Sequence, residues 1–179
     1  MSHIERVDIF GFWGDRHLTL KLFPDVNFLI GPNGSGKTTA INTIAAALTG
    51  DFPTLDRLPF QSISIKLYDP TTRRKPSVEV TKKPRIRSPF PAIDYSIRDS
   101  AAAAATQYSL DELAEERLYR DYATVRVRHS QLYRHAAADV TQRLQELAPT
   151  SWLSIHRGPA LRSTRDDRTT DFTVDQKGR

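Results

Sequence analysis

Residues 31–38 read Gly-Pro-Asn-Gly-Ser-Gly-Lys-Thr and fill every fixed position of the pattern G-x-x-x-x-G-K-[ST]. In this loop, the P-loop, backbone N–H groups wrap a polyphosphate and the next helix aims its positive end at the same anion. Glycines are needed because side chains would block the wrapping and because some positions take a positive φ. In such a loop Lys37 reaches the β- and γ-phosphates, and the Thr38 hydroxyl coordinates Mg²⁺.

The residues on both sides of the loop supply the required order of strand, loop and helix. A short apolar run precedes the loop and predicts a strand buried on both faces: Val26, Phe28, Leu29 and Ile30. An apolar stripe with helical spacing follows the loop: Ile41, Ile44, Ala45 and Leu48. Gly50 stands where a helix C′ residue belongs. This context disfavours the alternative, a glycine-rich turn with an incidental lysine.

Composition limits the class of protein. The 179 residues are enough for about one domain with a real core. A formal charge of +5 favours an anionic partner such as a nucleotide or nucleic acid, although a basic surface alone would explain it. There is no cysteine, so no disulfide or thiolate metal site is expected. No signal peptide or apolar stretch of membrane-spanning length is present, which predicts a cytoplasmic protein without a membrane partner.

Alternation of apolar and polar residues predicts strands before and after the P-loop. Residues 4–10 and 17–22 form two half-buried strands ahead of the loop, as an antiparallel layer would. Residues 63–67 and 78–80 then form a β-hairpin. The stretch from Arg73 to Arg87 contains seven cations and a single acid, Glu79. Such a run is most often a solvated edge, and the alternative is contact with a DNA backbone.

The C-terminal third is predicted to be mainly helical. The capping-box spacing from Ser109 to Glu112 predicts a helix to about Tyr122. A second helix has one apolar stripe and ends before Pro149; its stripe residues are Leu132, Ala136, Val140, Leu144 and Leu147. A short strand is expected at residues 152–155. The polar residues 162–179 are expected to be extended or disordered.

With these features together, residues 26–39 and the strands before them resemble the N-terminal half of an ABC-class ATPase head. The type is that of SMC, Rad50, RecF and OLD-nuclease proteins, often labelled "AAA family ATPase" in bacteria. The resemblance implies an α/β fold: a P-loop NTPase lobe with an antiparallel β layer packed near the P-loop strand and helix. Residues 1–160 would form this N-terminal lobe, with a helical insert at about 98–148, and residues 161–179 a polar tail or the start of a linker. Only the P-loop is specific.

The resemblance also implies the ligands, ATP and Mg²⁺, and the residues that hold them. Lys37 is the catalytic candidate and Thr38 the metal ligand, while the cofactor-binding set is Asn33, Gly34, Ser35, Gly36, Lys37, Thr38 and Thr39. In similar heads the loop between the first two strands lies beside the nucleotide. Phe12, Trp13 and Arg16 are therefore candidates for contact with the base or ribose, with hydrophobic packing at a turn as the alternative.

Several parts of a complete head cannot be found in the sequence. The family's Q-loop glutamine is expected near His156, where this chain has His-Arg, and Gln61 is a weaker candidate, so no Q-loop residue is assigned. A Leu-Ser-Gly-Gly-type signature and an Asp-Glu Walker B strand are also missing. Hydrolysis in this class needs both, so the chain alone is expected to hydrolyse ATP negligibly.

The expected function is therefore that of the ATP-binding N-terminal half of an SMC-like or OLD-like ATPase. It would be completed by a C-terminal half or a second head, as a dimer, and would act in DNA repair or anti-phage defence. The alternatives are a transporter-type nucleotide-binding subunit, which the long helical insert disfavours, and a non-catalytic nucleotide-binding regulatory module.

Overall fold

The structure is a computed structural model, and it describes residues 2–84, 91–110 and 131–150. Within the helix that begins at Gln131, side chains are described from Ala136 onward. The predicted helix at 109–122, the predicted strand at 152–155 and the polar tail lie outside this range, apart from Ser109 and Leu110.

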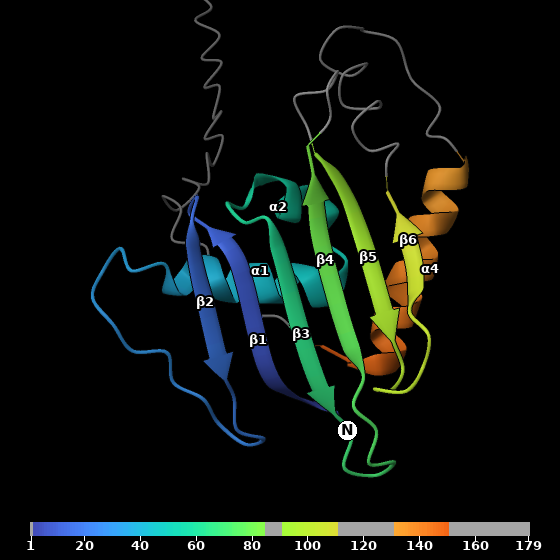
Figure 1. The fold of residues 1–179 in the computed structure, drawn as a ribbon, viewed down its shortest axis with the longest axis horizontal. Helices are drawn as coiled ribbons and strands as arrows, with labels where there is room; N and C mark the ends of the chain where they lie inside the picture. Colours follow the sequence, from blue (N-terminus) through green and yellow to red (C-terminus); the bar gives the residue numbers. More distant parts are fainter. Residues whose placement is uncertain (1, 85–90, 111–130, 151–179) are drawn as a thin grey trace, which may run out of the picture.

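One antiparallel sheet of six strands dominates the described residues, in the order β2-β1-β3-β4-β5-β6 (Figure 1). The strands are β1 (His3–Phe12), β2 (Arg16–Lys21), β3 (Ser62–Tyr68), β4 (Ser77–Lys83), β5 (Ala92–Arg98) and β6 (Thr106–Ser109). The two strands ahead of the P-loop and the hairpin β3–β4 are confirmed. β1 lies between β2 and β3, so residues on either side of the P-loop are joined in one sheet.

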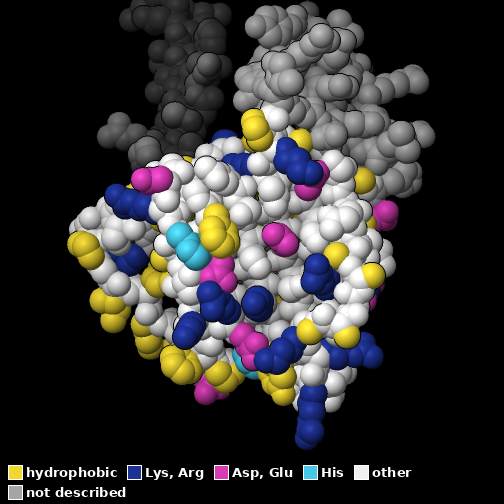
Figure 2. Space-filling view, in the orientation of Figure 1, with side chains coloured by type: hydrophobic (Ala, Val, Ile, Leu, Met, Phe, Trp, Pro, Cys, Tyr) yellow, Lys and Arg dark blue, Asp and Glu magenta, His cyan; other side chains and the backbone are white. Residues whose placement is uncertain are grey.

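The alternation that predicts these strands also separates the two faces of the sheet. Along β3, Ile63, Ile65 and Leu67 are fully buried, whereas Ser64 is half-buried and Lys66 is exposed. The three helices among the described residues lie on the side of the buried residues, behind the sheet in Figure 1. We call the opposite side the outer face; it is seen in Figure 2, where charged side chains gather over the strands.

The helices are α1 (Lys37–Thr49), α2 (Phe52–Arg57) and α4 (Gln131–Leu147). α1 ends where predicted, because Gly50 adopts φ 68° and donates its N–H to the carbonyl of Ala46. Its buried side is made mostly of alanines, and Ile41 of the predicted stripe is exposed. α4 matches the second predicted helix, with Val140 and Leu144 in the core.

The predicted strand at residues 26–30 is wrong. These residues form no strand, and four apolar side chains are exposed there: Val26, Phe28, Leu29 and Ile30. A strand buried on both faces needs neighbours at both edges and a layer on each side, and no described element supplies them. The apolar pattern therefore does not form a strand here, because the described residues offer it neither neighbouring strands nor covering layers.

Three elements were not predicted. α2 begins within the predicted break at residues 51–53, with Asp51 as N-cap accepting the Thr54 N–H at 3.1 Å. β5 and β6 lie where a helical insert was expected to begin, so the predicted insert at 98–148 contains a strand. In β5 the alternating Ile93, Tyr95 and Ile97 are buried, so a usable signal was present after the proline-rich stretch.

Candidate functional site

The P-loop is a tight turn that leads directly into α1. Gly34 and Gly36 take φ values of 81° and 93°, which favour glycine. The Ser35 N–H donates to the carbonyl of Pro32 at 3.3 Å, and the Ala40 N–H donates to the carbonyl of Gly36 at 2.8 Å. The first of these bonds closes the turn, and the second begins the helix at the residue where the sequence pattern requires it.

The N-terminus of α1 keeps its free backbone donors. Gly36 is the N-cap residue and makes no side-chain cap bond, and no acidic residue lies in the first turn. The N–H groups of a first helical turn have no partner inside the helix and carry its positive dipole end. Thr38 is exposed beside them and Thr39 is half-buried. This end of α1 is therefore suited to an anion.

Lys37 is held inside the loop by three oxygen atoms. Its Nζ donates to the carbonyls of Gly31 and Pro32, both at 2.7 Å, and lies 3.4 Å from the Ser35 Oγ. The ammonium group thus lies over the loop rather than in open solvent. Lys37 is also the first residue of α1, so its ammonium group is bound to the loop that leads into the uncapped end of that helix.

The end of β1 packs against the P-loop at Gly36. A Cβ at Gly36 would lie 2.8 Å from Phe12 Cε1 and 3.5 Å from Trp13 Cη2, so only glycine fits. The rings of Phe12 and Trp13 stack with centroids 5.4 Å apart. Phe12 is 4% exposed and Trp13 is 41% exposed. Phe12 is therefore a packing residue, whereas Trp13 has a free ring surface beside the loop.

The turn that carries Trp13 is anchored to the start of β3. Trp13 has φ 52°, and its N–H donates to the carbonyl of Pro59 at 3.0 Å. The Gln61 N–H donates to the carbonyl of Phe10 at 2.9 Å, and its Nε2 lies 3.5 Å from the carbonyl oxygen of Gly14. In the described structure Gln61 braces this turn. The guanidinium of Arg16 lies 5.9 Å from the centre of the Trp13 ring.

A family model described as "AAA domain" matches residues 3–146 of the chain. The chain belongs to this AAA domain family. The match spans the P-loop and the six described strands, and it makes the chain a nucleotide-binding, ATPase-like module with an α/β fold. AAA domains generally use ATP and Mg²⁺.

In this AAA domain the basic run from Arg73 to Arg87 is not one surface. Arg73, Arg74 and Lys75 lie at the β3–β4 turn, and Lys82 and Lys83 lie at the far end of β4. The two ends of β4 are about 20 Å apart. Within the described residues the run therefore forms no single basic surface, because β4 separates residues that are close in sequence. Contact of the run with DNA stays a prediction.

Lys82 and Lys83 also point to opposite faces of β4. The Lys82 Nζ donates to the carbonyls of Asp56 and Leu58, at 3.1 and 2.5 Å, and lies 4.3 Å from the centre of the Phe60 ring. Desolvation by burial lowers the pKa of Lys82 to about 8, against the opposing charge of Asp56. Lys82 thus ties the C-terminal end of α2 to the sheet and is not available to a partner.

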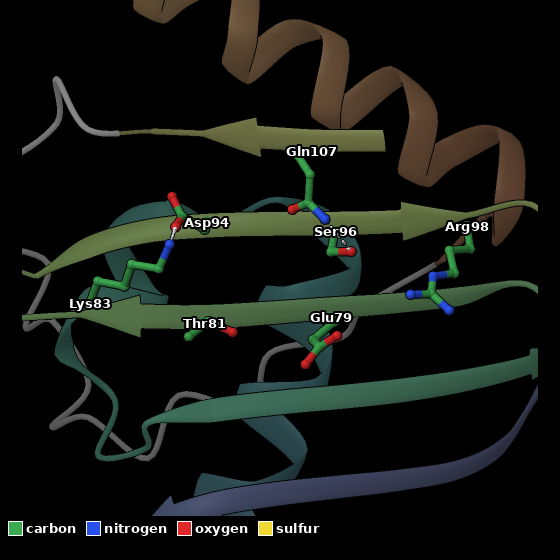
Figure 3. A pocket seen from close by; sticks show the side chains of 7 residues that line it. All are labelled: Glu79, Thr81, Lys83, Asp94, Ser96, Arg98 and Gln107. Carbon is green, nitrogen blue, oxygen red and sulfur yellow. Dashed lines mark hydrogen bonds and ion pairs between the residues drawn. The ribbon is translucent and has the colours of Figure 1, made fainter. Parts of the chain in front are cut away.

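Lys83 lies on the outer face, at one end of a shallow hollow over β4, β5 and β6 (Figure 3). Its Nζ is 2.6 Å from a carboxylate oxygen of Asp94, and Asp94 also accepts the Ser109 hydroxyl at 2.7 Å. Gln107 donates to the Ser96 Oγ at 3.0 Å. Most polar groups of the hollow therefore already bond to one another.

The described ranges contain no cluster of three or more histidine and carboxylate side chains arranged around a metal position. The same ranges contain no helix with the length and apolar character of a membrane span.

Proposed function

We propose that this AAA domain is the ATP–Mg²⁺-binding N-terminal half of an SMC-like or OLD-like ATPase that acts in DNA repair or anti-phage defence. One observation carries the proposal: the Lys37 ammonium is bound to the carbonyls of the P-loop, and that loop leads directly into the uncapped N-terminus of α1. A triphosphate is the ligand that fits cationic and N–H donors of this kind.

Each residue of the loop has a proposed role. The backbone N–H groups of the residues from Asn33 to Gly36 bind phosphate oxygens, and Lys37 neutralises the charge on the β- and γ-phosphates. Thr39 would lie near the α-phosphate. Thr38 would be the protein ligand of Mg²⁺, with phosphate oxygens and water as the other ligands. The exposure of Thr38 in the first turn of α1 is compatible with this role.

Trp13 and Arg16 are proposed to contact the base or ribose. The exposed ring of Trp13 lies beside the loop, and its turn is fixed by the bond to Pro59. An aromatic face held in this way loses little conformational entropy when a base stacks on it. Phe12 is buried and is assigned to packing instead.

The segment 26–30 supports the need for a second half. Its exposed apolar side chains run directly into the P-loop, and Ile30 is 91% exposed. Such a run is stable as a strand only between neighbouring strands and layers. We infer that a C-terminal half or a second head supplies them, together with the carboxylate that orients water, and that the complete protein is a dimer. The chain alone should then bind ATP but hydrolyse it negligibly.

The test is ATP binding by the full chain and by Lys37→Ala and Thr38→Ala, each with and without Mg²⁺. A hydrogen bond to a charged group contributes about 1.5–3 kcal/mol, so Lys37→Ala should weaken binding by roughly 10- to 100-fold. Thr38→Ala should weaken it mainly when Mg²⁺ is present. Arg57→Ala, which removes an exposed cation from α2, is the matched control and should bind normally.

Two results would contradict the proposal. An equal loss of ATP affinity in Thr38→Ala with and without Mg²⁺ would contradict the role of Thr38 as a metal ligand. Steady ATP turnover by the chain alone, abolished in Lys37→Ala, would show that no second half is needed for hydrolysis.

A further inference from the structure

Four cations from four different strands form one row across the outer face of the sheet. Lys21 of β2 pairs in register with Arg6 of β1, and Arg6 pairs with Lys66 of β3. Lys66 pairs with Ser77 of β4, and Ser77 pairs with Arg98 of β5. We call Lys21, Arg6, Lys66 and Arg98 the cation row. Its four strand spacings of about 4.8 Å make it about 19 Å long.

The register and the strand alternation place all four side chains on the same side. Val7, Ile65 and Ile97 are adjacent to Arg6, Lys66 and Arg98 along their strands and are buried against the helices. Leu20, adjacent to Lys21, is half-buried and packs against the same core. In Figure 2 dark blue side chains gather over the lower half of the sheet. In Figure 3 the Arg98 side chain extends from β5 toward β4.

Folding alone does not explain this arrangement. Like charges directly opposite each other on neighbouring strands are destabilising. Lysine on an edge strand discourages aggregation, which accounts for Lys21 on β2 but not for Arg6 and Lys66 on the interior strands β1 and β3. Arg6 has a local partner, Asp8, with Nε–Oδ2 and Nη2–Oδ1 distances of 2.7 and 2.9 Å. Within the described ranges Lys21, Lys66 and Arg98 have no ion pair.

Further cations and few acids surround the row. Lys75 follows the β3–β4 turn, 5.8 Å from the centre of the Tyr68 ring and 3.5 Å from a carboxylate oxygen of Glu5. Arg73 and Arg74 are exposed at the same turn. The acids on this part of the outer face are Asp8, Glu5 and Glu79, the first two of which are paired with cations of the same surface. The excess of cations over acids on this surface favours binding of an extended anion.

We propose that the cation row binds the sugar-phosphate backbone of a nucleic acid. Over about 19 Å, one strand of a duplex presents five or six phosphates at about 3.4 Å of axial rise each, more than enough to meet the row. Contacts of this kind carry no base information, so the base sequence should matter little. Arg6 is six residues before Phe12 on β1, so the row lies about 20 Å from the P-loop side of the sheet. The inference goes beyond the proposed nucleotide site and does not depend on it.

The experiment measures binding of the nucleotide-free full chain to a labelled DNA duplex, and to one strand of that duplex, over a salt series. If three phosphates are neutralised, duplex affinity should fall about 40-fold between about 50 and 200 mM salt. Lys21→Gln, Lys66→Gln and Arg98→Gln should each reduce the slope by roughly 0.9. Arg57→Gln, the same loss of charge on the helical side, should leave the slope unchanged.

A thermal melt of each variant separates binding from folding. Lys66→Gln removes a like-charge contact, so its melting temperature should be unchanged or raised while the slope falls. The inference is overturned if the row variants keep the wild-type slope, if they melt earlier than Arg57→Gln, or if polyglutamate competes as well as DNA does. Binding that is weakened by the row variants supports the inference, whether the ligand is the duplex or the single strand. The ligand that binds more tightly is the preferred form. Lys37→Ala should bind DNA normally, so failure of the nucleotide proposal would be seen separately.

Discussion

The segment 26–30 and strand β3 are both short and rich in apolar residues, yet their environments are opposite. In β3 the apolar side chains alternate with polar ones, so a single covered face buries all of them. In the segment 26–30 Phe28, Leu29 and Ile30 are consecutive, so in a strand their side chains would point to both faces. Such a run is buried only if both of its faces are covered. Burial is therefore decided by the number of available layers and not by apolar content alone.

The largest expected effect compares one isoleucine from each region. Ile65→Ala should reduce the free energy of unfolding by about 2–5 kcal/mol, because Ile65 is fully buried between strands and helices. Ile30→Ala should change it by less than about 0.5 kcal/mol, since the side chain is 91% exposed. Urea denaturation of the full chain measures both. Similar destabilisation by the two variants would mean that the segment 26–30 is packed, which would contradict the difference in burial between the two regions.

A smaller effect tests the point where the P-loop meets the sheet. Gly36→Ala should destabilise by about 1–3 kcal/mol, because φ is 93° and the new methyl group meets the Phe12 ring. Gly34→Ala has a similar strained φ of 81°, but nothing lies within 4 Å of its Cβ position. Phe12→Leu should therefore relieve part of the cost of Gly36→Ala and none of the cost of Gly34→Ala. A double-mutant cycle measured by urea denaturation would show no coupling for either glycine if the contact were unimportant.

A pH-dependent effect concerns Lys82, a charged side chain that is partly buried, in contrast to the exposed apolar side chains of the segment 26–30. Desolvation lowers its pKa to about 8 in the folded protein, from an ordinary value of 10.5. Between pH 8 and 10.5 the unfolded chain then binds more protons at this residue, so this contribution makes the folded protein more stable as pH rises. Below pH 8 Lys82 is protonated in both the folded and the unfolded chain, so its contribution to the free energy of unfolding does not change with pH.

The check is the difference in unfolding free energy between wild type and Lys82→Met as a function of pH. Wild type should gain stability relative to the variant from pH 8 to 10.5 and level off above it. A difference that stays flat or moves the other way would mean that the bonds to Asp56 and Leu58 favour the charged form more than burial opposes it.

The order of basic residues in the sequence is misleading in two opposite ways. The run Arg73–Arg87 looked continuous because residues were compared with their neighbours in sequence, but β4 separates its ends and turns Lys82 inward. The cation row was invisible for the opposite reason, because Lys21, Lys66 and Arg98 are far apart in the chain and only strand pairing brings them into line.

The sequence by itself determined the local units of this protein. The P-loop pattern, the start of α1 at Lys37, its end at Gly50 and the alternation of β1 to β4 depend on bonds and periodicities spanning a few residues. Only the tertiary structure decided the strand order, the exposure of the segment 26–30, the approach of Phe12 to Gly36 and the line of cations on the outer face. These features depend on pairing between distant residues, and no local periodicity specifies which strand lies beside which.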